Sequence, residues 1–404
     1  MDGGGARLGR FVAGDPLRGL AAMAVVAWHA AYLSLAALGL HTGLGPHLDT
    51  SLYYGHPVGD VLRAGSLSVY LFFVLSGYLI GRPFVRAYVA GAPRPRVRSY
   101  ARNRIFRIYP IFIVSCLILL AIYGLDGETV PKTINIMLLG DTARVGWGSH
   151  IQQMWSLKVE VAFYAMLPLA LFALAFVTRP VARRVPPWGR AVIIGVPITL
   201  LGAFSLATHW DEAIYATLPG EFWAFVPGLL LATIEPFAMP AVRDRPRAVR
   251  TGLVLTVAGF VVMMTYLPAV RTLGPGWGKL IAVISTGMLV GGPLLAEWTG
   301  MRPWRAFDNR VLHWLGERSY PIFLVHWALL FEIAPLFDIT GPKKTLAVVW
   351  PLTLAITLVL ADILHRLVER PFMRRKKRTV PTAEVPEPVV LPDVAPAAVP
   401  AQTG

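Results

Sequence analysis

The chain has 404 residues, of which 55% are hydrophobic and 15% are charged. This composition predicts a polytopic membrane protein. The net charge of +15 does not indicate a nucleic-acid partner, because the basic residues fall in short clusters between long apolar runs, as topology signals do. The single cysteine, Cys116, excludes an internal disulfide and a cysteine-based metal site.

Ten apolar runs are long enough to cross a bilayer, which predicts an all-α bundle of about ten transmembrane helices. They cover residues 17–39, 66–86, 105–124, 154–177, 191–208, 218–237, 251–270, 279–298, 317–337 and 345–366. The first run follows basic residues, as a signal peptide does. Its length favours an uncleaved helix, since the apolar core of a signal peptide has roughly 7–15 residues.

Arginine clusters occupy alternate connecting segments, at 86–104, 178–190, 239–250 and 299–316, and the intervening loops contain few basic residues. By the positive-inside rule the arginine-rich segments are cytoplasmic. An even number of spans then places both termini in the cytoplasm as well.

The end of the chain differs in composition from the rest. From Thr379 onward it consists mainly of Pro, Ala and Val with a few acids, and it follows the basic cluster MRRKKR. We therefore expect a membrane domain over residues 1–375 and a disordered cytoplasmic tail over residues 376–404.

His29 lies about twelve residues inside the first predicted helix, near the middle of the bilayer. A polar group at that depth is costly unless it faces a protein interior or a water-filled cavity. Arg18 precedes it by eleven residues, just over three full turns, so both side chains share one face. This pattern suits the wall of a substrate channel. Alternatively, His29 bonds a neighbouring helix and Arg18 extends to lipid head groups.

Arg104 and Arg107 open the third predicted helix within the motif RNRIFRIYP. Their i, i+3 spacing places both guanidinium groups on one face, where they suit phosphate groups. The alternative is positive-inside anchoring. The position of Arg107, one turn inside the apolar run, weakens that alternative.

Two further helices contain polar residues at membrane depth. Glu160, in the motif WSLKVEVAFY, lies two residues from Lys158 and so faces another direction, which indicates a different partner for its carboxylate. His326 lies in the ninth helix, with Ser319 and Tyr320 near the base of that helix. Each is a candidate functional group by virtue of its depth.

Six motifs, in this order, resemble those of the acyltransferase 3 family of bacterial membrane O-acyltransferases. They are DPLRGLAAMAVVAWHA, VYLFFVLSGYLI, RNRIFRIYP, WSLKVEVAFY, SYPIFLVHW and HRLVERPFMRR, and the match extends over roughly residues 11 to 375. The resemblance implies transfer of an acyl group, often acetyl, from acyl-CoA to a hydroxyl of a sugar, surface glycan, lipid or macrolide-type molecule.

The resemblance also implies roles for individual residues. His29 would be the general base, with Glu160 or Asp15 orienting its ring by accepting the second N–H. The phosphates of acyl-CoA would lie against Arg18, Arg104 and Arg107 at the cytosolic mouth. Ser319, Tyr320 and His326 would support the site. Acyl-CoA would be a co-substrate, with no permanently bound cofactor and no metal, and the enzyme would reside in the bacterial cell membrane.

One rival function and two further sequence features have interpretations that do not rest on this resemblance. A secondary transporter would also have about ten helices, buried His and Glu and a basic inner face, although no internal repeat is visible. His41, His47 and His56 crowd the first outer loop, but their spacing matches no recognised metal site. The pair Gly77 and Gly81 indicates close helix packing rather than a ligand loop.

Overall fold

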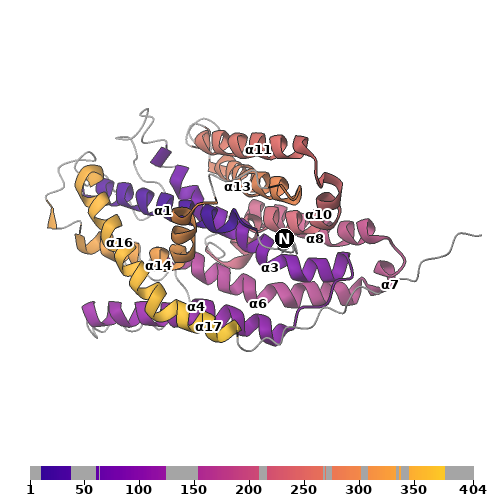
Figure 1. Ribbon diagram of the computed structural model, residues 1–404, viewed down its shortest axis with the longest axis horizontal. Coiled ribbons are helices and arrows are strands. Elements are labelled where there is room, and N and C mark those ends of the chain that lie inside the picture. The colour runs from indigo at the N-terminus through magenta and orange to yellow at the C-terminus, as the bar shows by residue number, and fades with distance from the viewer. Residues whose placement is uncertain are drawn as a thin grey trace, which may run out of the picture.

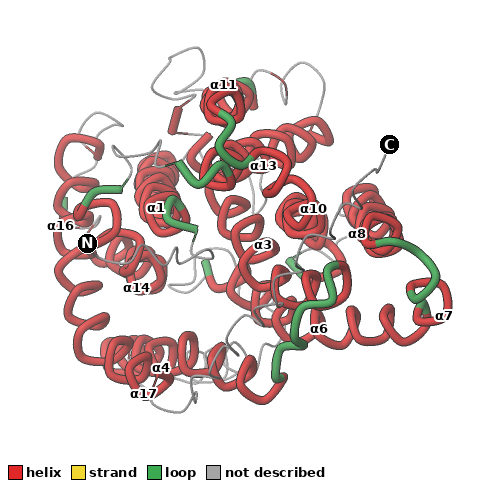
Figure 2. Tube along the Cα trace, turned by 45° about the vertical axis from the view of Figure 1, so that its right-hand side comes forward, coloured by secondary structure: helices red, strands yellow, loops and turns green. Residues whose placement is uncertain are grey.

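The computed structural model describes residues 11–37, 61–62, 64–123, 153–208, 216–266, 269, 275–301, 308–333, 336–337 and 345–377. Within these ranges every regular element is a helix and none is a strand (Figure 2). The predicted all-α fold is therefore confirmed for this part of the chain. The histidines of the first outer loop and the predicted tail from residue 378 onward lie outside the described residues.

The helices follow the predicted apolar runs. They are α1 (Gly14–Ala37), α3 (Ser68–Val89), α4 (Val97–Tyr123), α6 (Met154–Val177), α8 (Pro187–Thr208), α10 (Val226–Val242), α11 (Pro246–Met264), α13 (Pro275–Trp298), α14 (Arg310–Ile333) and α16 (Trp350–Leu364). Shorter elements are η2 (Gly65–Leu67), α7 (Arg179–Ala182), α9 (Leu218–Glu221), η3 (Phe222–Ala224), η5 (Thr345–Val349), η6 (His365–Glu369) and α17 (Arg370–Lys377).

Six helical segments of the described chain are long and apolar enough to cross a membrane. They are Gly65–Val89, Met154–Val177, Pro187–Thr208, Pro246–Met264, Trp277–Trp298 and Ala347–Arg374, and a bent pair, Leu218–Ala224 with Val226–Val242, would make a seventh. Helices α1, α4 and α14, of 24, 27 and 24 residues, carry the histidine candidates and all the charged candidates except Glu160, which lies on α6. The count of about ten spans and the cytoplasmic location of both termini remain predictions.

The structure differs from the sequence-based expectations in two respects, the shape of one helix and the residues at which two others begin. The run at 218–237 is not one straight helix, because it bends by 51° where α10 restarts at Val226. Pro227 occupies the first turn of α10 and has no N–H to continue the hydrogen-bond ladder from the preceding turn. Helices α4 and α14 begin several residues before the apolar runs at 105 and 317. Helical hydrogen bonding continues into polar segments, whereas hydropathy marks only the apolar part.

Helix α3 lies at the centre of the bundle and packs against α1, α6, α10 and α13 (Figure 1). Gly77 and Gly81 face α10. A Cβ at Gly77 would collide with the carbonyl oxygen of Phe225, and one at Gly81 would lie 2.6 Å from a methyl carbon of Leu229. The prediction that this glycine pair serves close helix packing is confirmed. The next residue, Arg82, forms an ion pair of 2.6 Å with the buried Glu235 of α10.

Helices α1 and α14 make a second close contact, side by side in Figure 2. A Cβ at Gly19 would lie 2.8 Å from the Cβ of Leu315, and a Cβ at Gly316 would collide with the carbonyl of Asp15. Only glycines at these two positions let the backbones approach so closely. The two helices run in the same direction, because His29 and His326, each ten residues beyond its glycine, also meet.

We predict that Gly77→Ala destabilises the fold, because the added methyl collides with a backbone carbonyl that cannot rotate away. The expected loss in the free energy of unfolding is about 1–3 kcal/mol, measured by denaturant titration in detergent. Gly195→Ala is the matched control, because a Cβ there meets its nearest neighbours at an ordinary 3.9–4.0 Å. Equal stability of the two variants would contradict the packing account.

Candidate active site

A cavity of about 60 Å³ lies where α1, α3, α4, α6 and α14 converge. Its polar wall includes Arg18, Ser76, Arg107, Glu160, Tyr164, Ser319 and Tyr320. Five of these seven residues are candidates from the sequence, so the fold brings together side chains up to about three hundred positions apart in the chain. The close packing of α3 on α10 fixes which face of α3 lies toward α6, and Ser76 lies on that face.

Glu160 is held by two hydroxyl groups on the wall of the cavity. The Ser76 hydroxyl donates to its Oε1 at 2.5 Å, and the Tyr164 hydroxyl, one helical turn further along α6, donates to the same oxygen. These two donors fix the orientation of the carboxylate on the cavity wall. Glu160 and two of the candidate arginines therefore line the same cavity.

The three candidate arginines gather around this carboxylate. Arg18 and Arg107 line the cavity, and Arg18 also pairs with Asp15 across 3.6 Å. Arg104 does not line the cavity. Its guanidinium lies 5.5 Å from the centre of the Tyr164 ring and 5.8 Å from that of Tyr100, as in cation–π contacts. The predicted i, i+3 pair thus contributes one arginine to the cavity and one directly behind its wall.

His29 of α1 and His326 of α14 form a direct hydrogen bond. The Nδ1 of His29 lies 2.8 Å from the Nε2 of His326, and the two rings are nearly parallel, with 13° between their planes. His326 is fully buried and His29 is half-buried. Trp327 packs edge-on against the His29 ring, with centroids 4.5 Å apart. The pair is therefore a rigid element between two helices.

One backbone carbonyl fixes the protonation pattern of this pair. The Nδ1 of His326 lies 3.0 Å from the carbonyl oxygen of Ile322, which can only accept, so Nδ1 carries the proton. In a neutral His326 the Nε2 is then an acceptor, and the Nδ1 of His29 must donate to it. A neutral His29 is left with an unprotonated Nε2. That nitrogen is the form a general base requires.

The structure corrects the expected partner of His29. The resemblance implies Glu160 or Asp15 as the acceptor of its second N–H, but His326 occupies that position. Glu160 is bonded to Ser76 and Tyr164 instead. Asp15 lies fourteen residues before His29 on the same helix, about 21 Å along its axis, which is beyond the reach of a side chain.

Phe323 lies between the histidine pair and the arginine-lined cavity. Its side chain lines the cavity, and its ring centroid is 6.0 Å from that of His326. Below it, the Tyr320 hydroxyl donates to the carbonyl of Ile108, which ties α14 to α4, and the Ser319 hydroxyl donates within its own helix at 2.9 Å. Ser319 and Tyr320 thus shape the cavity, and the imidazoles lie about one turn above it.

Comparison with known proteins identifies the family to which the chain belongs. The family profile described as "acyltransferase domain", that of acyltransferase 3, matches residues 14–366. The chain belongs to the acyltransferase 3 family. It is 27% identical over 409 residues to the acyltransferase MdmB of Streptomyces mycarofaciens, a match that covers 92% of this chain and 94% of that protein.

A second relative is the peptidoglycan O-acetyltransferase OatA of Listeria monocytogenes, 24% identical over 337 residues. That match covers 77% of this chain and 52% of the relative, so the chain spans about half of its length. No solved structure matches the chain. Family membership and these relatives support acyl transfer at a membrane as the activity of the chain.

Three residues of this candidate site were not singled out from the sequence. Ser76 and Tyr164 lie within motifs that were recognised, and the i, i+4 spacing of Glu160 and Tyr164 is a usable signal for their contact. Phe323 also lies within a recognised motif, SYPIFLVHW, but nothing distinguishes it there, because a phenylalanine in an apolar helix is ordinary. Within the described residues no group of three or more His, Cys, Asp or Glu is placed to hold a metal ion. His41, His47 and His56 are not among them.

Proposed function

We propose that this chain is an acyl-CoA-dependent O-acyltransferase of the bacterial cell membrane. It transfers an acyl group, such as acetyl, to a hydroxyl of a sugar, surface glycan, lipid or macrolide-type small molecule. Family membership and the relatives named as acyltransferases support the reaction class. The acetyl donor is inferred in part from the relative whose name includes O-acetyltransferase.

The observation that carries this proposal is the unprotonated Nε2 assigned to His29, next to an arginine-lined cavity. In the proposed step the acceptor hydroxyl attacks the thioester carbonyl carbon and its proton passes to His29 Nε2. A C–O bond forms and the C–S bond breaks. The proton then passes from His29 to the departing sulfur, which leaves as the free thiol of CoA. His326 is a positioning residue that keeps accepting from Nδ1 while His29 is charged.

The donor is bound through its phosphates by the arginines. CoA is made in the cytosol, and Arg18, Arg104 and Arg107 gather below the histidine pair. Fork-shaped guanidinium donors suit phosphate oxygens. Glu160, held by Ser76 and Tyr164, balances part of this positive charge and positions the arginines rather than the imidazole. The acceptor enters from the outer side or from the cytosol.

A secondary transporter is less well supported than an enzyme. The family profile and the relatives named as acyltransferases favour acyl transfer, and none of these names describes a transporter.

We predict that the purified protein in liposomes releases free CoA from acetyl-CoA only when a hydroxylated acceptor is added. His29→Ala should reduce kcat by about 10²–10⁴-fold, the usual contribution of a general base, with little change in the KM for acetyl-CoA. Thiol release and the unfolding midpoint are measured on the same samples. Wild-type turnover in His29→Ala, or solute flux without CoA release, would reject the proposal.

His326 variants test the role of the second imidazole. His326→Gln retains a carbonyl oxygen able to accept from Nδ1 of His29, whereas His326→Leu cannot accept a hydrogen bond. We predict that the Gln variant keeps a clearly larger share of kcat than the Leu variant, with equal KM for acetyl-CoA. The same kcat in both variants would show that His326 only fills space.

Charge removal at Arg107 tests the donor site. We predict that Arg107→Gln raises the KM for acetyl-CoA about tenfold or more, because a charge-assisted contact to phosphate is lost from a half-buried site. Arg98→Gln is the control, since Arg98 is an exposed residue at the start of the same helix. An unchanged KM in Arg107→Gln would show that this arginine serves only positive-inside anchoring.

A further inference from the structure

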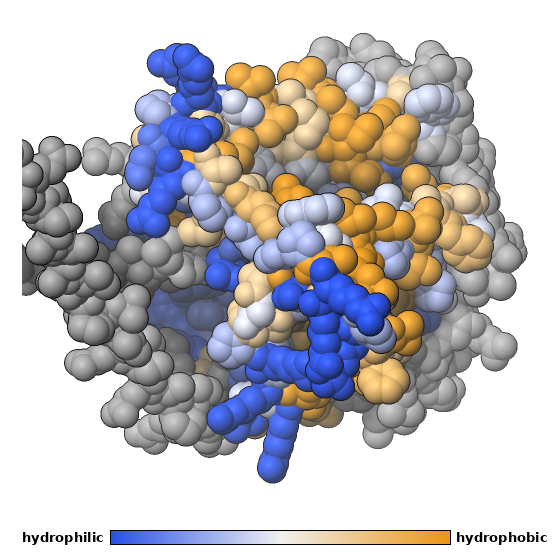
Figure 3. All heavy atoms as spheres, turned by 90° about the vertical axis from the view of Figure 1, so that its right-hand side faces the viewer, coloured by the Kyte–Doolittle hydropathy of each residue, from blue (hydrophilic) through white to orange (hydrophobic). Residues whose placement is uncertain are grey.

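A second, larger cavity lies at the end of the bundle where α3 and α6 meet α7 and α8. It has a volume of about 730 Å³, which is the size of a site for a nucleotide-sized molecule. Four arginines line it: Arg94 from the α3–α4 connection, Arg179 and Arg183 from α7 and its C-terminal cap, and Arg190 from α8. Figure 3 shows hydrophilic residues over this end of the molecule, among apolar ones.

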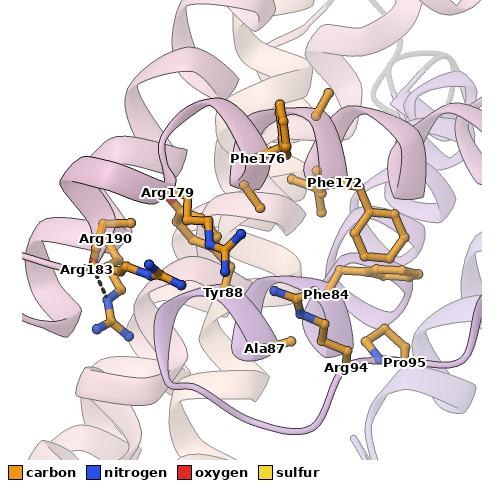
Figure 4. Close-up of a pocket in the computed structure, with 14 residues that line it drawn as sticks. Phe84, Ala87, Tyr88, Arg94, Pro95, Phe172, Phe176, Arg179, Arg183 and Arg190 are labelled. Atoms are coloured by element: carbon orange, nitrogen blue, oxygen red, sulfur yellow. Dashed lines mark hydrogen bonds between the residues drawn. The ribbon is translucent and has the colours of Figure 1, made fainter.

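All the charged residues that line this cavity are basic. No acidic residue lines it, and no ion pair within the described chain joins any of the four arginines to a carboxylate. Arg190 donates its Nε to the carbonyl of Ala182 at 2.9 Å, which fixes that side chain to the α7 turn. In Figure 4 Arg94 and Arg179 reach from opposite sides into the space between α3 and α6. The site is therefore built for an anion of more than one negative charge.

The other part of the lining is aromatic. Phe84, Tyr88, Phe172 and Phe176 border the cavity, and the rings of Phe84 and Phe172 lie 6.0 Å apart, edge to face. Aromatic faces next to guanidinium groups suit a flat ring that carries phosphate, as a nucleotide does. Positive-inside anchoring requires only that arginines lie on one side of the membrane. It does not require that they converge on an aromatic-walled cavity.

The two cavities lie along the same pair of helices. On α3 the smaller cavity contains Ser76, and the larger one contains Phe84 and Tyr88, which are eight and twelve residues further on. At 1.5 Å per residue this displacement is about 12–18 Å. Aromatic contacts connect the two: Phe84 packs on Tyr100 at 5.1 Å, and Arg104 lies over both Tyr100 and Tyr164.

We propose that the four-arginine cavity binds the phosphorylated nucleoside end of the acyl-CoA donor, with the 3′-phosphate among Arg94, Arg179 and Arg183 and the adenine against the aromatic wall. This inference rests on the proposed function. It extends the donor site from the arginines near Glu160 to the cytoplasmic end of α3 and α6. The acyl end of the same molecule then points along these helices toward His29.

The test compares acetyl-CoA with 3′-dephospho-acetyl-CoA as donors. The wild-type enzyme should favour acetyl-CoA in kcat/KM by about tenfold or more, and Arg179→Gln and Arg183→Gln should bring that preference close to one. Arg184→Gln is the matched control, because Arg184 is exposed, adjacent to Arg183 and outside the cavity lining. It should keep the wild-type preference. A preference that persists in Arg179→Gln and Arg183→Gln would overturn the inference.

Binding of 3′-phosphoadenosine 5′-phosphate, measured by equilibrium dialysis on the full chain, separates this inference from the proposed function. Binding lost in Arg183→Gln but kept in Arg184→Gln supports the site even if no acyl transfer is found. Transfer from acetyl-CoA with no binding of this nucleotide leaves the proposed function standing and rejects the site.

A phospholipid head group could also bring a phosphate to the four-arginine cavity. Varying the lipid composition distinguishes this source from the acyl-CoA donor. The assays are repeated in nanodiscs of phosphatidylcholine alone and with added phosphatidylglycerol. The donor preference should be the same in both. If Arg179→Gln and Arg183→Gln instead remove only a dependence on phosphatidylglycerol, the cavity is a lipid site and the proposal is wrong.

Discussion

The approach of α1 to α14 is the constraint on which the candidate site depends. Gly19 and Gly316 let the two backbones meet near their N-terminal ends, and the helices run in parallel from that contact. His29 and His326 lie ten residues beyond these glycines, about 15 Å along each axis, and so reach the same depth. Were either glycine larger, the rings would no longer meet at 2.8 Å and the proton on Nδ1 of His29 would lose its acceptor.

The polar and charged side chains of the two cavities and the histidine pair lie at three successive levels along the bundle. The histidine pair lies at one level, the cavity with Arg18, Arg107 and Glu160 lies about one turn below it, and the four-arginine cavity lies at the end of α3 and α6. Among the residues that line the two described cavities only Glu160 is acidic, and it is fixed by two hydroxyl donors. Such a gradient suits a long molecule that is multiply charged at one end and neutral at the other. It is the electrostatic shape of an acyl thioester carried on a phosphorylated nucleotide.

The sequence predicts the helices and most of the polar candidates, because both depend on information local to each helix. Apolar runs identify the spans, and the cost of polar groups at membrane depth identifies His29, Glu160 and Arg107. Partners across the bundle are not local. His326 lies 297 positions from His29, and nothing in the periodicity of either helix states that they meet. Glu160 was therefore paired with the wrong group.

Local sequence also misses features that depend on backbone geometry between elements. The bend at Val226 follows from how Pro227 restarts a helix, although the run around it is uniformly apolar. The convergence of four arginines from three segments depends on how α6, α7 and α8 turn at one end of the bundle. Read along the chain, the same residues are indistinguishable from topology signals.

Nitrogen-15 NMR of histidine-labelled protein in lipid tests the central claim most directly, with His29 and His326 assigned by the signals lost in His29→Gln and His326→Gln. The account predicts a protonated Nδ1 and an unprotonated Nε2 on both neutral rings, and a coupling across the hydrogen bond from His29 Nδ1 to His326 Nε2. An unprotonated Nδ1 on His29, or no coupling between the two rings, would contradict it.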